Sequence, residues 1–137
     1  MRLRYRFISV EYGKPAQMEK GQRSSWSHFY PMPYSRGDVW RPPTDVYETD
    51  EHVVVTMELA GVKEEDIEVT IFNDILVVSG SRQDNRRPEK LLYHEMGINF
   101  GRFRGEVFLP LRVSPECVEA HYENGFLYIW LLKSCQP

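Results

Sequence analysis

Histidine is the side chain in this sequence best suited to hold a metal ion or to move a proton near neutral pH. The sequence contains neither of the patterns that bring two histidines to one metal ion, a pair at i and i+4 or a His-Glu-x-x-His arrangement. The four histidines are His28, His52, His94 and His121. We expect His121, which faces opposite to Ala120 on an alternating segment, to be an exposed side chain rather than a ligand.

The two cysteines could bind zinc or form a disulfide. Cys117 and Cys135 lack the second Cys-x-x-Cys half of a zinc site and are too few for a disulfide framework. They fit a reducing cytoplasm. We therefore expect Cys117 to be a small half-buried side chain and Cys135 to be a free thiol.

Acidic and nucleophilic groups offer no catalytic arrangement either. Glu64, Glu65 and Asp66 are adjacent carboxylates that could serve acid/base chemistry, but a solvated loop is their expected setting. The sequence has no Gly-x-Ser-x-Gly elbow, no phosphate-binding glycine loop and no dinucleotide fingerprint. We predict that the protein is not an enzyme and uses no catalytic residue, metal ion or cofactor.

Length and composition limit the class of protein. The 137 residues suffice for one domain with its own core, and 42% hydrophobic with 27% charged residues is typical of a soluble globular chain. No apolar run approaches the roughly 20 residues of a membrane span. Residues 1–7 carry charge but no apolar core of signal-peptide length. We expect a cytoplasmic protein with no membrane partner.

Charge is unevenly distributed along the chain. Residues 1–40 hold seven Lys/Arg and three Asp/Glu, a net charge of +4, whereas residues 41–137 hold ten and seventeen, a net charge of −7. A basic segment can indicate nucleic-acid binding, but these charges are scattered and accompany no recognition helix. We expect self-association between the two parts rather than a nucleic-acid partner.

The first forty residues show neither helical nor strand periodicity, yet they hold eight of the eighteen aromatic residues. Disordered linkers ordinarily lack aromatic side chains, because such side chains drive burial. A poorly structured but aromatic-rich arm therefore predicts contacts with a partner or with other copies. Packing of the arm back onto the domain is the alternative.

From residue 41 the pattern changes to that of β-strands. Residues 52–59, for example, place Val53, Val55, Met57 and Leu59 on one face. The expected strands cover residues 52–59, 67–71, 75–79, 91–96, 100–109, 118–122 and 126–132. Asn73-Asp74 and Asn124-Gly125 tolerate the positive φ of two-residue hairpin turns.

Short strands, tight turns and the lack of a convincing helix predict an all-β fold, an antiparallel immunoglobulin-like β-sandwich. We expect three parts: a flexible arm over residues 1–40, the sandwich domain over residues 41–133, and a very short C-terminal tail over residues 134–137.

Four segments, in order, resemble the bacterial-type alpha-crystallin domain of small heat-shock proteins. They are residues 41–50 (RPPTDVYETD), residues 58–67 (ELAGVKEEDI, similar to E-L-P-G-V-x-x-E-D-I), residues 101–103 with 109–110 (GRF and LP), and residues 120–127 (AHYENGFL, similar to A-x-x-x-N-G-x-L). Each motif alone is weak. Together, in this order, they identify the chain as a member of that family.

The resemblance implies an ATP-independent chaperone, or holdase, that binds unfolding client proteins and assembles as a homodimer or a larger oligomer. It implies a dimer strand that pairs with the partner near residues 45–49, made of Leu91, Leu92, Tyr93, His94, Glu95 and Met96. It also implies a docking groove formed by Ile67, Val69, Ile71, Val118 and Ala120. The arm residues expected to contact clients and neighbouring subunits are Ile8, Val10, Trp26, Phe29 and Tyr30.

The sequence departs from the family pattern at three places. Ala60 stands where proline is usual, Gly105 stands where relatives often have arginine, and no apolar-x-apolar motif follows Leu132. In relatives that motif fills the groove. Ile8-Ser9-Val10 has the same spacing, with both β-branched side chains on one side of an extended segment. We predict that it docks in the groove, from its own or a neighbouring chain.

A binding module of the same sandwich fold is the alternative function. Such adaptor or co-chaperone domains recognise one folded partner. They usually lack the charged loop and crossing strand that residues 81–96 are expected to provide, so the sequence favours the chaperone.

Overall fold

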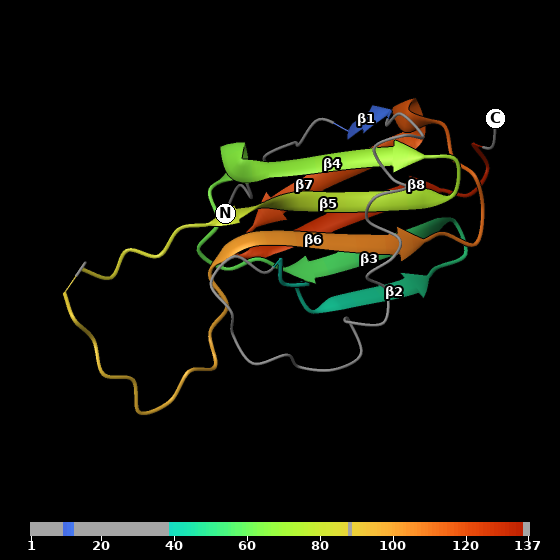
Figure 1. The fold of residues 1–137 in the computed structure, drawn as a ribbon. Helices are drawn as coiled ribbons and strands as arrows, with labels where there is room; N and C mark the ends of the chain where they lie inside the picture. Colours follow the sequence, from blue (N-terminus) through green and yellow to red (C-terminus); the bar gives the residue numbers. More distant parts are fainter. Residues whose placement is uncertain (1–9, 13–38, 88, 136–137) are drawn as a thin grey trace, which may run out of the picture.

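Alternating apolar residues build two sheets in the part of the chain that the computed structural model describes, residues 10–12, 39–87 and 89–135. One sheet has the strand order β1-β4-β5-β6 and the other β2-β3-β8-β7. Figure 1 shows the two sheets stacked on each other. The strands are β1 (Val10–Tyr12), β2 (Thr44–Glu48), β3 (His52–Glu58), β4 (Ile67–Phe72), β5 (Ile75–Arg82), β6 (Gly101–Phe108), β7 (Val118–Glu123) and β8 (Phe126–Leu132).

Neighbouring strands are antiparallel, with one exception at the edge of the first sheet. There β1 runs parallel to β4, with Val10 opposite Val69 and Tyr12 opposite Ile71. The remaining pairs are antiparallel. The prediction of an all-β antiparallel sandwich is confirmed.

The core lies between the two sheets and consists of the inward members of each alternating strand. Val53, Val55 and Met57 on β3 are fully buried, as are Leu127 and Ile129 on β8. Each such side chain contributes about 1.5–3 kcal/mol by leaving water. This packing fixes the edges and loops on which the candidate surfaces lie.

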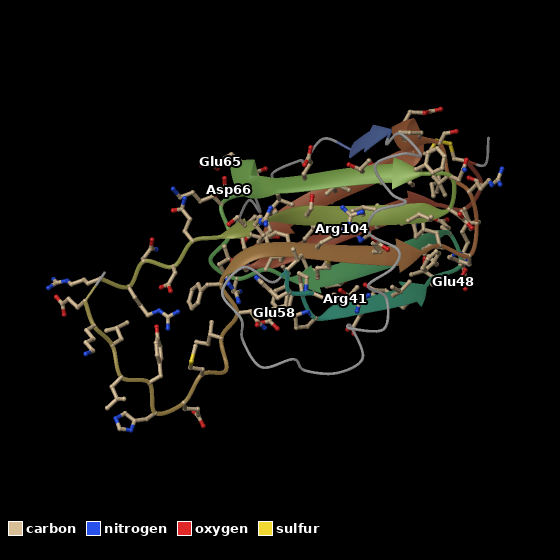
Figure 2. All side chains as sticks on the ribbon, viewed as in Figure 1. Arg41, Glu48, Glu58, Glu65, Asp66 and Arg104 are labelled. Carbon is tan, nitrogen blue, oxygen red and sulfur yellow. A yellow bond between two sulfur atoms is a disulfide. The ribbon has the colours of Figure 1, made fainter. Side chains whose placement is uncertain are left out.

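Two short 3-10 helices lead into strands. Helix η2 (Glu64–Asp66) precedes β4, and helix η3 (Pro115–Cys117) precedes β7. The acidic cluster expected on a loop therefore forms one helical turn. Figure 2 shows Glu65 and Asp66 beside the start of β4.

Residues 91–96 form no strand within the single chain, and their pairing with the strand of a second chain stays a prediction. They belong to the long segment between β5 and β6 that projects from the sandwich in Figure 1. A strand needs a neighbour for its backbone hydrogen bonds. The apolar pattern is present, but no described strand lies beside it.

The prediction of a free thiol at Cys135 is wrong, because Cys135 forms a disulfide with Cys117. Their Cα atoms are 6.1 Å apart although the residues are 18 positions apart in sequence. The pairing of β7 with β8 brings them together, since Cys117 directly precedes one strand and Cys135 closely follows the other.

The prediction of an exposed His121 is also wrong, since its side chain is buried. Alternation does place it on the outer face of β7. Its ring, however, lies 4.9 Å from that of Trp130 on β8, and its Nε2 lies 3.5 Å from a carboxylate oxygen of Glu119. A large aromatic neighbour on the adjacent strand can cover an outward side chain.

Candidate functional site

The predicted groove lies at the edge of the sandwich where β4 of one sheet faces β7 of the other. Ile67, Val69 and Ile71 on β4 point inward and are buried, as is Ala120 on β7. Val118 is half-buried. Four of the five predicted groove residues therefore belong to the buried core, and Val118 packs against it.

Strand β1 lies along this edge. Its backbone pairs with β4, and it also lies against β7 and η3. Val10 is thus placed beside the groove, whereas Ile8 lies outside the described residues. Docking of Ile8-Ser9-Val10 stays a prediction, as does the role of Trp26, Phe29 and Tyr30, which also lie outside the described part of the chain.

The long segment between β5 and β6 presents apolar side chains to solvent. Leu92 is 83% exposed and Ile98 64% exposed, far more than an apolar residue inside a sandwich. Leu91, Tyr93 and Met96 are exposed as well. Figure 2 shows this segment extending away from both sheets. The six residues of the predicted dimer strand therefore lie on an accessible projection.

Arg82 anchors the base of this projection. Its guanidinium group donates to the carbonyl oxygen of Asn99 through Nε, at 2.7 Å, and through Nη2. Nη1 donates to the carbonyl oxygen of Ala60 at 3.0 Å. The group also lies 4.4 Å from the centre of the Trp40 ring. Arg82 thus ties the end of β5 to the residues just before β6.

Trp40 is part of the same anchor. Its backbone N–H donates to the carbonyl of Arg102 and its carbonyl accepts from the N–H of Arg104. Its ring packs against Phe103 with centres 5.5 Å apart. Sequence reasoning assigned Trp40 to the arm and did not identify the role of Arg82. The motif at residues 41–50 could have suggested that the domain begins as early as Trp40. Arg82, by contrast, is one of several arginines in a charged segment, and nothing in the sequence distinguishes it from the others.

Strand β2 is an open edge of the second sheet, because it pairs with β3 and with no other described strand. The backbone N–H of Glu58 donates to Pro43, and that of Thr49 donates to His52. In an antiparallel pair, hydrogen-bonded positions alternate with positions that point away. Because Pro43 and Thr49 bond to β3, the positions between them that do so are 45 and 47. The N–H and C=O of Val46 point away from β3 and are available to another strand.

Gly105 is an inward-facing position on β6 and is buried. A Cβ at this position would lie 2.7 Å from Cε of Met57, so even a methyl group would require the Met57 side chain to shift. The neighbouring Arg104 faces outward, where its Nε donates to Oε1 of Glu106 at 3.0 Å. Both arginines of β6, Arg102 and Arg104, therefore lie on the outer face of the sheet.

Tyr122 holds the turn that follows β3. Its hydroxyl lies 2.6 Å from the carbonyl oxygen of Leu59 and 2.8 Å from that of Val62. Burial raises the pKa of Tyr122 above its ordinary value, while the hydrogen bond to Val62 and the charge of Arg82 act in the opposite direction. The phenol is thus neutral and able to donate at neutral pH.

Within the described ranges, no group of three or more His, Cys, Asp or Glu side chains is placed to hold a metal ion. In the same ranges, no helix is long and apolar enough to cross a membrane. The chemical features of the described chain are therefore an apolar projection, an open strand edge and the short strand β1 at the edge of β4.

The chain is similar to known proteins. A model of the Hsp20/alpha crystallin family matches residues 45–137. Small heat shock protein C2 of Rickettsia felis is 31% identical over 113 residues, which cover 81% of this chain and 73% of that protein. Spore protein SP21 of Stigmatella aurantiaca is 37% identical over 92 residues, which cover 67% of this chain and 54% of that protein.

The crystal structure of hspA from Xanthomonas axonopodis has a TM-score of 0.64 with this structure at 26% identity, covering 73% of this chain and 100% of that one. The family match spans most of the chain, and the resemblance carried by the four sequence motifs is confirmed. The chain belongs to the Hsp20/alpha crystallin family.

Proposed function

We propose that this protein is an ATP-independent holdase that binds unfolding client proteins and prevents their aggregation. The observation that carries the proposal is the projecting segment between β5 and β6, with its exposed Leu91, Leu92, Tyr93 and Met96. Large apolar side chains gathered on one accessible segment mark an interaction surface. Membership of the Hsp20/alpha crystallin family supports the same function.

The chemistry of the projection suits binding without strict specificity. Leucine and methionine side chains adapt to irregular apolar partners, since methionine in particular has three flexible bonds and a polarisable sulfur. Client binding of this kind needs no nucleotide.

We further propose that two chains form a homodimer by strand exchange, with residues 91–96 of each chain pairing with β2 of the other. Two observations support this. The projection has the apolar character of a strand but no described strand beside it, and β2 has outward backbone groups at Val46. Pairing would satisfy both sets of groups. Larger oligomers would then form through the arm.

The proposal keeps the division into an arm (1–40), a domain (41–133) and a tail (134–137), except that Trp40 joins the domain because its backbone bonds to β6. Ile8 and Val10 dock at the groove beside β4. The position of β1 supports this docking, because Val10 already pairs with Val69. The proposed location is the cytoplasm, which the low cysteine count of the sequence supports. There Cys117 and Cys135 would spend most of their time as thiols.

An aggregation assay tests the holdase. The protein is mixed with several unrelated proteins that aggregate on heating, and light scattering is followed with and without ATP. We expect protection of all of them, unchanged by ATP. Protection of a single protein would indicate a dedicated adaptor, and a requirement for ATP would exclude the mechanism proposed here.

A deletion variant tests whether the projection binds clients. Deleting residues 87–96 removes Leu91, Leu92, Tyr93 and Met96 but leaves Arg82 and Asn99, which hold the base of the segment. Protection should fall at least severalfold, while circular dichroism shows the sandwich intact. Undiminished protection would place client binding elsewhere.

A further inference from the structure

The disulfide between Cys117 and Cys135 joins the open end of the β7–β8 hairpin. Cys117 is the last residue of η3, directly before β7, and Cys135 lies three positions after the end of β8. The last aligned pair of the hairpin is Val118 with Leu131. The Cα separation of 6.1 Å lies within the range that a disulfide spans without backbone movement. Both cysteines are half-buried, so small thiol reagents can reach them.

The element that carries Cys117 is in contact with the N-terminal strand. Strand β1 lies against both η3 and β7, in addition to its pairing with β4. Among the described residues, β1 is also the shortest strand, with three residues, and it occupies an edge. A strand this short depends on its neighbours, because three residues form few hydrogen bonds.

We propose that Cys117 and Cys135 form a reversible redox site that controls whether β1 stays seated beside β4. In the disulfide form, η3 is tied to the end of β8 and gives β1 a fixed neighbour. In the dithiol form, η3 and residues 133–135 lose this connection, and β1 leaves the edge of β4 more often. The site responds to low-molecular-weight disulfides, of which oxidised glutathione is the probe.

The reaction is a pair of thiol–disulfide exchanges. One cysteine thiolate attacks a sulfur of oxidised glutathione, which forms a mixed disulfide and releases one glutathione thiolate. The second cysteine thiolate then attacks the protein sulfur of that mixed disulfide and releases the second glutathione. The two cysteines lose two electrons in total, and one oxidised glutathione becomes two reduced molecules.

The consequence for assembly rests on the proposed function of the groove. When β1 leaves, the edge of β4 opens to an apolar segment from another chain or from a client. Oxidation would then close the groove and reduction would open it. A reducing cytoplasm keeps the groove available, and oxidative stress closes it.

Hydrogen exchange on the full chain tests the switch. The protein is oxidised with oxidised glutathione or reduced with dithiothreitol, and amide exchange is followed by mass spectrometry. We expect exchange in Val10–Tyr12 to be at least tenfold faster in the reduced protein, while β3 (His52–Glu58), in the centre of the other sheet, is unchanged. Equal exchange of Val10–Tyr12 in both forms would overturn the proposal.

A cysteine-free variant provides the control. The double substitution Cys117→Ser and Cys135→Ser should give the fast exchange of the reduced protein under both conditions. A redox response that persists in this variant would show that other groups cause it and would refute the site. The aggregation assay is read separately: a redox-dependent β1 in a protein that protects no client would sustain the switch and exclude the holdase.

Discussion

At the scale of single residues, the turn between β7 and β8 is tightly constrained. Asn124 has a φ of 51° and Gly125 a φ of 82°, so both adopt the left-handed conformation of a type I′ turn. The carbonyl of Gly125 also accepts a hydrogen bond from the N–H of Leu59 at 2.7 Å. The Asn-Gly pair thus joins the hairpin to the turn after β3, and the two sequence motifs meet at this point.

Replacing Gly125 by alanine should destabilise the protein by about 2 kcal/mol or more, because a left-handed non-glycine residue alone costs about 1–2 kcal/mol. The added Cβ would also lie 2.9 Å from Cα of Ala60. Urea denaturation measures the change. Gly97→Ala is the matched control, since a Cβ there meets nothing within 4 Å. Equal stability of both variants would show that this turn is not constrained as described.

Tyr122 provides a second test at this scale. Removing its hydroxyl with Tyr122→Phe leaves the carbonyls of Leu59 and Val62 without that donor and should cost about 1 kcal/mol. Tyr47→Phe, at an exposed position on β2, should change stability little. Thermal denaturation of the two variants at neutral pH makes the comparison.

The pH dependence of the same residue has a definite sign. Burial raises the pKa of Tyr122 in the folded protein, so the unfolded chain loses this proton at lower pH than the folded one. The contribution to stability is therefore present below the unfolded tyrosine pKa and is lost as pH rises through the folded pKa. Wild type should lose stability relative to Tyr122→Phe above about pH 10. A constant difference between the two proteins from neutral to alkaline pH would contradict this.

At the scale of elements, most strands follow from alternation, because one face of each strand must be buried. The periods over residues 52–59 and 67–71 correspond to β3 and β4, with the predicted residues facing inward. An apolar pattern alone does not predict a strand correctly where the segment has no neighbouring strand in its own chain. Residues 91–96 have the apolar content of a strand, but the described chain provides no neighbour with which they could pair.

Two contacts between distant elements could not be read from residue types. The Cys117–Cys135 disulfide depends on how β7 is aligned with β8. A separation of 18 positions in the sequence does not reveal that alignment. The seating of β1 depends on which sheet edge is open. The spacing of Ile8 and Val10 led to the prediction that they dock at this edge, which stays a prediction, whereas the parallel pairing of Val10–Tyr12 with β4 comes from the topology.

The open edge of β2 gives a prediction about assembly. Val46→Pro removes an N–H that points away from β3, so it leaves the β2–β3 hydrogen bonds in place and blocks an incoming strand. We expect the dimer to dissociate at least tenfold more readily, measured by analytical ultracentrifugation. Val46→Thr, which keeps the N–H, should dimerise as wild type does. If both variants remain equally dimeric, the dimer does not form along β2.

At the scale of the whole molecule, the sandwich buries its core between the two sheets, and an edge of each sheet can pair with a further segment. Strand β2 is open at one edge, and the opposite edge is lined by β4, β7 and the short β1 (Figure 1). Exposed edges favour association with further strands. A buried core with exposed sheet edges suits the proposed function, in which the chain pairs with a second copy and binds clients.

The last prediction concerns the edge of β4, along which β1 lies. If Ile8 and Val10 anchor the N-terminal strand beside β4, replacing both by glycine removes the apolar contacts and raises the conformational entropy lost on docking. The strand should then leave its place, and the groove near Val69 should bind a hydrophobic dye several times more strongly. The assembly should shrink if the strand comes from a neighbouring chain and keep its size if it comes from the same chain. Ser9→Gly tests the added flexibility alone and should change neither property. Unchanged dye binding in the double variant would show that the groove stays covered without Ile8 and Val10. These two residues would then not be the ones that hold β1 in place.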